Sequence, residues 1–199
     1  MNKKDKRSRK TARAVQNALL QLLCERRIDE IKIVDLCTAA DINRTTFYLH
    51  YTRIGDVLDE LRDEITERIC SESDARFDFA VPSDPLPFLK VCTKVLESYE
   101  NLGDFVEQSA DADMFLTGLK NEFAKNLFER YKVCCGRNSE TARYVLCFLV
   151  GGVLDSYTEW LKTRRLTTFS SVMYHCSPMV RAGLDILSKI IRDPLPTVR

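Results

Sequence analysis

The sequence contains little glycine and proline, with 7 and 6 residues respectively in a chain of 199. Both residues are unfavourable inside helices, so their scarcity beside abundant Leu, Arg, Glu and Lys predicts a helical protein. No run of about 18 apolar residues is present, which excludes a membrane-spanning helix. The charged N-terminus has no apolar stretch behind it, so we expect no signal peptide, no membrane contact and a cytoplasmic location.

Catalytic and metal-binding patterns are also missing. The two histidines, His50 and His175, have no metal-ligand spacing with any of the eight cysteines, and no CxxC pair occurs. The chain has no G-x-S-x-G, P-loop, dinucleotide-binding or H-E-x-x-H motif. We therefore expect no enzyme, no metal and no cofactor. The cysteines are interpreted as reduced thiols, although a redox role for the adjacent Cys134 and Cys135 stays open.

Charge is unevenly distributed along the chain. Residues 1–53 contain 12 Lys and Arg and 6 Asp and Glu, a net charge of +6, whereas residues 54–199 carry a net charge of −5. A basic head on an acidic body indicates that the head binds a polyanion, although a solvated tail would give the same balance.

Apolar periodicity predicts an all-α protein of about nine helices. Val15, Leu19 and Leu23 follow helical spacing, and so do Leu58, Leu61 and Ile65. Pro and Ser-Pro segments interrupt the pattern, with Ser177-Pro178 typical of a helix start, although Pro178 could instead kink one longer helix. The expected helices are 8–26, 33–40, 44–51, 55–79, 86–101, 104–110, 112–133, 139–163 and 177–192.

The second and third of these helices, behind a basic first helix, have the layout of a helix-turn-helix. Asp41 and Ile42 form the tight turn, and the Asn43 side chain can cap the next helix. Phe47 and Tyr51 share its inner face with Ile42. In such motifs the second helix enters the DNA major groove and its side chains read the bases.

The outer face of residues 44–51 carries suitable chemistry for DNA. Arg44 can make a bidentate contact with guanine, and Thr45 and Thr46 can contact a phosphate or a thymine methyl. Tyr48 and His50 can donate to phosphates. Two basic residues of the first helix, Lys10 and Arg13, could approach the flanking backbone.

The match extends beyond the general motif. Residues 11–61, TARAVQNALLQLLCERRIDEIKIVDLCTAADINRTTFYLHYTRIGDVLDEL, closely resemble the DNA-binding head of TetR/AcrR-family transcriptional regulators, most densely in IVDLCTAADINRTTFYLHY. Further on, FLVGGVLDSYTEWLK (148–162) is similar to the penultimate helix of that family's ligand-binding and dimerisation body. The resemblance implies a DNA-binding domain at 1–54 and an effector-binding and dimerisation domain at 55–199.

Three positions depart from the family pattern. Asp41 replaces the usual turn glycine, and Lys32 replaces a Thr cap but could reach a phosphate. Ile54 stands where a Lys usually contacts the DNA backbone, and the adjacent Arg53 could substitute for it. Because of Ile54, a protein-partner-binding coactivator with a degenerate DNA-binding head remains the alternative interpretation.

The resemblance implies that the protein is a homodimer and binds a palindromic operator in double-stranded DNA. It also implies that the protein is a repressor, which a small-molecule effector releases from the DNA. The dimer would form through the last two helices. There the paired Gly151 and Gly152 allow close helix approach, with a local kink as the alternative, and Leu184, Leu187 and Ile191 would complete the interface.

An apolar pocket in the body would bind the effector. Its expected wall, chosen by helix position, consists of Phe88, Cys92, Phe123, Phe148 and Tyr157. The alternative, which is favoured for any single residue, is that these side chains belong to the core. Few buried charges are evident, which favours a small apolar or aromatic ligand.

Overall fold

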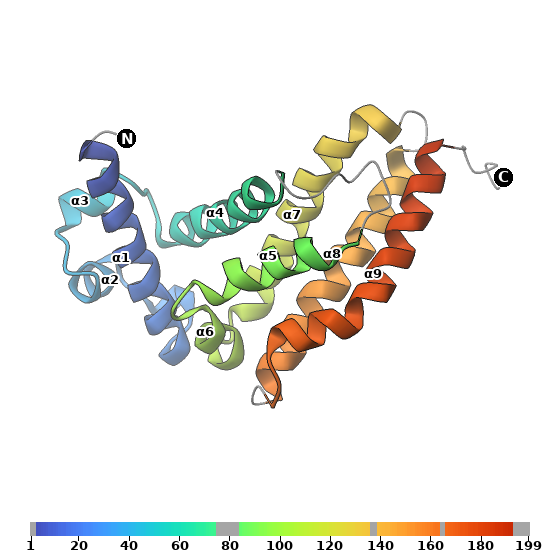
Figure 1. Cartoon of the computed structure of the whole chain (residues 1–199). Helices are drawn as coiled ribbons and strands as arrows, with labels where there is room; N and C mark the ends of the chain where they lie inside the picture. The colour runs from blue at the N-terminus through green and yellow to red at the C-terminus, as the bar shows by residue number, and fades with distance from the viewer. Residues whose placement is uncertain (1–2, 75–83, 136–138, 164–165, 193–199) are drawn as a thin grey trace. The chain divides into compact units, whose positions relative to one another are not determined.

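The chain folds into α-helices, with no strand in the described residues 3–74, 84–135, 139–163 and 166–192 of this computed structural model (Figure 1). This confirms the all-α expectation. The helices are α1 Lys3–Glu25, α2 Ile33–Ala39, α3 Arg44–Tyr48, α4 Ile54–Asp74, α5 Leu86–Glu97, α6 Leu102–Gln108, α7 Ala112–Cys135, α8 Ser139–Lys162 and α9 Phe169–Arg192, with a 3-10 turn, η1, at Ile28–Glu30. Residues 75–79 of the fourth expected helix lie outside the described residues. None of the described helices is long and apolar enough to span a bilayer.

The helices form two compact units. The first comprises Met1–Glu64 with Glu97–Phe115, and the second comprises Ile65–Leu96 with Leu116–Arg199. This division differs from the expected boundary after residue 54, because the first half of α4 and all of α6 pack with the N-terminal helices. The helix α4 therefore contributes residues to both units.

The turn between α2 and α3 has the expected helix-turn-helix geometry. Asp41 adopts the left-handed conformation with φ of 52°, which Asp tolerates better than most residues. The Ile42 N–H bonds the Cys37 carbonyl at 3.0 Å, which closes the turn. The helix α3 ends at Tyr48, three residues earlier than expected, and the chain tightens after it, since the His50 N–H bonds the Phe47 carbonyl only three residues earlier, at 2.9 Å.

Two helix starts differ from the sequence-based expectation. The helix α1 begins at Lys3 rather than Ser8, since Lys and Arg are good helix formers even in a highly charged segment. The helix α9 begins at Phe169, so the expected start at Ser177 is wrong and the longer helix through Pro178 is confirmed. Pro178 has no N–H for the Tyr174 carbonyl one turn earlier, and the Ser177 hydroxyl donates to that carbonyl instead, at 2.8 Å. The side chain thus compensates for the missing backbone bond.

In the second unit, α8 and α9 run side by side (Figure 1). A Cβ on Gly183 of α9 would lie only 2.4 Å from the nearest Leu149 atom of α8. The glycine that allows close helix packing within the chain is therefore Gly183, and neither Gly151 nor Gly152 has that part.

Candidate nucleic-acid interface

The outer face of α3 is the most exposed part of the helix-turn-helix. Phe47 is fully buried, whereas Arg44, Thr45, Tyr48 and Leu49 are exposed. At about 100° per residue, Thr45 and Leu49 point most directly away from Phe47. Leu49, the C-cap residue, keeps helical dihedrals and is 78% exposed. The centre of this face is thus a threonine and a leucine, with Arg44 and Tyr48 on one flank.

The start of α3 is fixed by Asn43, as the sequence indicated. The Asn43 Oδ1 accepts the Thr46 N–H at 2.7 Å and the Thr46 hydroxyl at 2.8 Å. One acceptor therefore holds both the backbone and the side chain of Thr46, which is half-buried, unlike its neighbour Thr45. Asn43 is exposed, and its amide nitrogen is a donor that an external acceptor can use.

Four candidate cations near this motif are exposed and make no ion pair with any described residue. Lys10 and Arg13 lie on α1, Lys32 precedes α2, and Arg44 opens α3. Lys32 has no acceptor with which to cap α2, and the Asp35 carboxylate instead reaches back to the Lys32 N–H at 3.4 Å. His50 is exposed as well.

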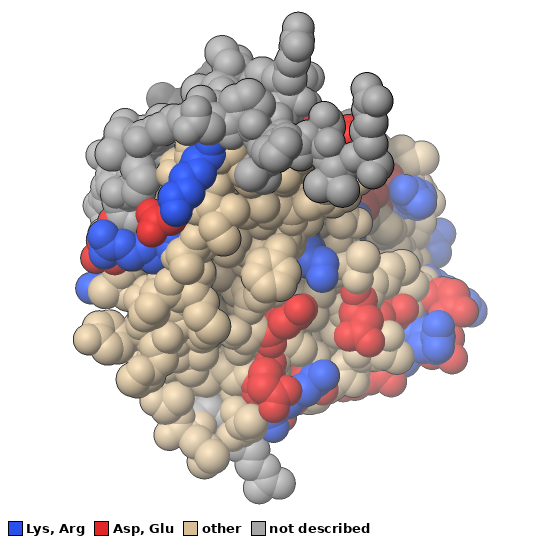
Figure 2. Space-filling model, turned by 90° about the vertical axis from the view of Figure 1, so that its right-hand side faces the viewer, with Lys and Arg blue, Asp and Glu red and all other residues tan. Residues whose placement is uncertain are grey.

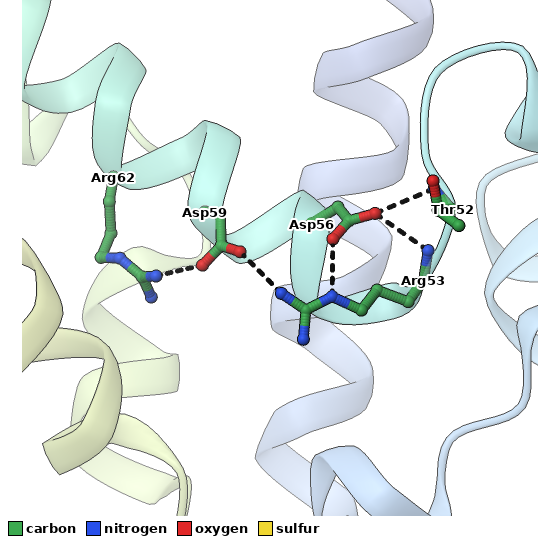
Figure 3. Close-up of polar contacts among 5 residues, drawn as sticks. All are labelled: Thr52, Arg53, Asp56, Asp59 and Arg62. Atoms are coloured by element: carbon green, nitrogen blue, oxygen red, sulfur yellow. Dashed lines mark hydrogen bonds and ion pairs between the residues drawn. The ribbon is translucent and has the colours of Figure 1, made fainter.

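Arg53 differs from these four because carboxylates surround it (Figure 3). Its Nε contacts Asp56 at 2.8 Å and its Nη2 contacts Asp59 at 3.3 Å. Asp56 also accepts the N–H groups of Thr52 and Arg53, at 2.9 and 3.0 Å, which caps α4. These two backbone bonds, together with the Arg53 side chain, lower the pKa of Asp56, so it is ionised at neutral pH. Asp59 in turn pairs with Arg62.

A hydrogen-bonded cluster joins the helix-turn-helix to α4. The Tyr51 hydroxyl donates to Glu60, and the Tyr99 hydroxyl donates to Glu64 at 3.2 Å. The buried Gln16 amide of α1 donates to both carboxylates, at 3.5 and 3.3 Å. Burial, the bond to Glu60 and the two carboxylate charges raise the pKa of Tyr51, so the phenol stays a donor at neutral pH. This cluster fixes the first unit's part of α4 relative to α1 and to the end of the motif.

A second buried contact ties the motif to the segment between α6 and α7. Asp111 is 6% exposed, and its carboxylate accepts the Ile28 N–H of η1 at 2.8 Å. It therefore satisfies a backbone donor that would otherwise lack a partner in the turn before α2.

A small cavity lies within the second unit, between α5, α7, α8 and α9. It encloses about 40 Å³ and exposes no polar surface. Phe88, Cys92 and Phe123 line it, as expected, with Phe88 and Phe123 stacked at 6.2 Å between ring centroids. Phe148 and Tyr157 do not line it. Phe148 is 79% exposed, and Tyr157 is buried against Trp160 and Phe169 instead. The remaining lining residues are Leu89, Leu127, Leu146, Leu149, Val150, Val153, Val180 and Leu184.

The thiols whose pKa is shifted are poor nucleophiles. Burial raises the pKa of Cys24, Cys37 and Cys92, so these groups stay protonated at neutral pH. The side chains of Cys134 and Cys135 lie outside the described residues.

Exposed apolar residues occur on α8 and α9, but they are other residues than those expected at the dimer interface. Leu187 is 1% exposed and Leu184 lines the cavity, so both point into their own chain. Gly151 packs near Lys120, whereas a Cβ on Gly152 would meet nothing within 4 Å. The Ile191 side chain lies outside the described residues.

The exposed large apolar residues of these helices are Tyr144 and Phe148 on α8 and Tyr174, Met179 and Ile186 on α9. Tyr144, Phe148 and Gly152 follow i, i+4, i+8 spacing and share one side of α8. In Figure 2, which faces the α9 side, uncharged residues cover the left part of the view, whereas charged residues lie at its upper left, below its centre and on its right. We call these five apolar residues with Gly152 the outward stripe.

Two solved structures have the same architecture. One is a TetR transcriptional regulator from Streptococcus agalactiae 2603V, with 23% sequence identity, a TM-score of 0.50 and coverage of 89% of this chain and 97% of that chain. The other, from Syntrophomonas wolfei, is described as a TetR-family transcriptional regulator, with 15% identity, a TM-score of 0.50 and coverage of 96% and 99%. No protein-family sequence profile and no curated protein matches the chain.

The fold is therefore that of the TetR-family transcriptional regulators, in which a helix-turn-helix head precedes a helical body. The sequence placed Leu49 toward the outside or the flanks of residues 44–51, but the expected DNA-binding residues did not include it. Its helical phase could have indicated a central position, because Leu49 lies two residues beyond Phe47 and so almost opposite to it. Sequence reasoning also missed Asp59 as a partner of Arg53.

Proposed function

We propose that the protein is a homodimeric, sequence-specific DNA-binding transcriptional regulator of the TetR type that acts in the cytoplasm. The observation that carries this proposal is the exposed outer face of α3, which presents base-reading and phosphate-binding side chains, in a unit where four exposed cations form no ion pair with any described residue. Such cations are available to neutralise phosphates, the interaction that dominates affinity for DNA.

Each candidate residue then has a distinct part. Arg44 would read a guanine, and Thr45 and Tyr48 would make base or phosphate contacts beside it. Lys10, Arg13 and Lys32 neutralise phosphates on either side. The exposed Asn43 amide and His50 can donate to phosphates, while Thr46 serves mainly to hold the start of α3.

The outward stripe supports the homodimer. Aromatic and aliphatic side chains on neighbouring antiparallel helices can pack against the same surface of a second copy in an isologous interface. Gly152 lies within the stripe and has open space before it, which suits close approach of a partner helix. In this arrangement the two heads read the two halves of a palindrome.

We further propose that a small apolar or aromatic effector binds the cavity and releases a repressor from DNA. The support is the cavity's composition, because carbon and sulfur walls offer no partner to a charged or strongly polar ligand. At about 40 Å³ the cavity is smaller than the roughly 150 Å³ that accommodates benzene. Effector binding therefore requires the cavity to widen. Both α4 and α7 contribute residues to the two units, and α7 also lines the cavity, so these helices connect such a change to the head.

A partner-binding coactivator is the second candidate. Half-buried Ile54 offers no charge where the family pattern has a Lys, and the adjacent Arg53 already contacts two carboxylates. Both facts reduce phosphate binding at the start of α4.

Fluorescence anisotropy separates the two candidates. The purified protein is titrated against labelled duplex DNA from upstream of its own reading frame, against duplexes selected from a random pool, and against unrelated DNA, each at two salt concentrations. Arg44→Glu reverses a charge on α3, and Lys125→Glu makes the same change on an exposed residue of α7 in the second unit.

We expect salt-sensitive, sequence-preferring binding that Arg44→Glu abolishes and Lys125→Glu leaves intact. Binding without sequence preference, or equal losses in the two variants, would refute the assignment of α3 as the reading helix. Absence of DNA binding would favour the coactivator.

A further inference from the structure

Arg53 is the cation best placed at the start of α4, yet its guanidinium is folded back along that helix. A Cβ on Gly55 would lie 3.7 Å from the Arg53 Cζ and Nη1, which shows how closely the group follows the first turn. The Nε and Nη2 form one edge of the guanidinium fork, and they contact Asp56 and Asp59 (Figure 3). Side-on bidentate binding of a phosphate uses this same edge.

We propose that Asp59 is a positioning residue that competes with a DNA phosphate for Arg53, and that Arg62 weakens this competition by sharing the Asp59 carboxylate. This inference rests on the proposed DNA-binding function. The regulatory contact lies beside Ile54, the position at which the family pattern has a lysine.

The two carboxylates around Arg53, those of Asp56 and Asp59, have different structural roles. Asp56 caps α4 through two backbone N–H groups, so it is required for the helix start whether or not DNA is present. Asp59 accepts no backbone bond in the described structure and contacts only the two arginines. Of the pair, Asp59 is therefore the carboxylate that can give up Arg53 without damage to the helix.

The two arginines also differ, and this sets the direction of the exchange. Arg62 is 20% exposed, and its guanidinium lies 5.8 Å from the centre of the Phe115 ring at the start of α7. Arg53 is 73% exposed, so water screens its contact with Asp59 more strongly than it screens the Arg62 contact. A phosphate would thus displace Asp59 from Arg53 and leave the Asp59–Arg62 pair intact. A movement of Phe115 that released Arg62 would have the opposite effect, because Asp59 would then hold Arg53 alone.

A double-mutant cycle tests the exchange. The cycle uses three single variants, Asp59→Asn, Arg62→Met and Arg53→Ala. It also uses two double variants, in which Arg53→Ala is combined with Asp59→Asn or with Arg62→Met. Arg62→Met keeps an apolar side chain over Phe115. The probe is a duplex that the wild-type protein selects from a random-sequence pool, and affinity is measured by anisotropy over a series of salt concentrations.

We expect Asp59→Asn to raise DNA affinity about two- to fivefold, the range that a surface ion pair contributes. The salt dependence should steepen by up to about one counterion, since one more phosphate is neutralised. Arg62→Met should lower affinity by a similar factor. In the Arg53→Ala background both changes should shrink toward zero. The charge-matched control Asp29→Asn, which removes another exposed ion pair of the same unit, should have little effect in either background.

The inference would be overturned if the effects of Asp59→Asn and Arg53→Ala on DNA affinity were additive. If Asp59→Asn raises affinity equally with and without Arg53, Asp59 acts only as a general negative charge. If Asp59→Asn lowers affinity, Asp59 aims Arg53 at the DNA, and the competition is refuted. Failure of the wild-type protein to select any duplex refutes the proposed function itself, and is thus distinct from failure of this inference.

Discussion

The N-cap of α3 allows stability and DNA binding to be separated at one residue. The helix has five residues, and Asn43 Oδ1 accepts two hydrogen bonds at its start, from the Thr46 N–H and hydroxyl. Asn43→Ala removes both bonds, and we expect the free energy of unfolding to fall by about 1 kcal/mol, within a range of about 0.5–2 kcal/mol for lost caps. Asn43→Asp keeps the acceptor and places a negative charge at a helix N-terminus, so stability should be retained or slightly raised.

DNA affinity should respond differently. In Asn43→Asp a carboxylate faces the phosphates beside Arg44, and like charges across an interface cost on the order of several kcal/mol, so we expect at least about a tenfold loss. Asn43→Ala should also bind more weakly, because α3 is less well formed.

The assay pairs urea unfolding, followed by circular dichroism, with anisotropy on the same samples. The control Thr38→Ala removes an exposed hydroxyl of α2 that bonds the Val34 carbonyl, and it should change neither quantity much. If Asn43→Asp binds DNA as tightly as the wild type, the start of α3 does not face phosphates. If Asn43→Ala is as stable as the wild type, the cap contributes nothing measurable.

Three further predictions follow from exposed or buried side chains. Leu49 should contact a thymine methyl, and this contact should be worth about 0.8 kcal/mol, or roughly fourfold in DNA affinity, per half-site. Replacing operator thymines by deoxyuridine should therefore weaken DNA binding by the wild type but not by Leu49→Ala. Equal losses of affinity in the two proteins would contradict this contact. Asp111→Ala should lower the free energy of unfolding, measured in urea, by about 1–3 kcal/mol, because the Ile28 N–H loses its acceptor. Asp111→Asn should lower it less. Equal stability of the wild type and both variants would refute the role of Asp111 as this acceptor. Phe148→Glu should convert a dimer of twice 22.9 kDa into a monomer, as measured by light scattering. The control Leu166→Glu changes an exposed apolar residue outside the outward stripe and should leave the dimer intact. A dimer that survives Phe148→Glu would place the interface elsewhere.

Local rules predicted the head well. The positive φ of Asp41, the cap by Asn43 and the burial of Phe47 all depend on residues within one or two turns of each other. The end of α3 was misplaced because Leu49 to Tyr51 are compatible with a helix. The tighter turn at its end, where the His50 N–H bonds the Phe47 carbonyl three residues earlier, is not indicated by any propensity.

The body was predicted less well because helix phase decides which side chains meet. Rotation by one residue is about 100°, enough to move a side chain from the cavity to the surface. Thus Phe148 was placed in the pocket but lies on the surface, and Leu187 was placed at the interface but is buried. Ser177-Pro178 looked like a helix start, since only the three-dimensional structure shows the Ser177 hydroxyl bonding the carbonyl that Pro178 leaves open.

The energetics of α4 favour regulation by weak surface contacts rather than by rearrangement of the core. Allosteric coupling free energies are typically about 1–3 kcal/mol. Exposed ion pairs contribute about 0–1 kcal/mol each, so the two pairs that share Asp59 together have the size such coupling requires. By contrast, moving α4, and with it Glu60 and Glu64, away from Gln16 of α1 would leave a buried amide without partners, which costs more. An effector that shifts α7 slightly, and with it Phe115 and Arg62, could therefore change how firmly Asp59 holds Arg53 while the buried cluster stays intact. In that mechanism the effector's influence on DNA affinity should disappear in Arg53→Ala even though the protein still binds both ligands.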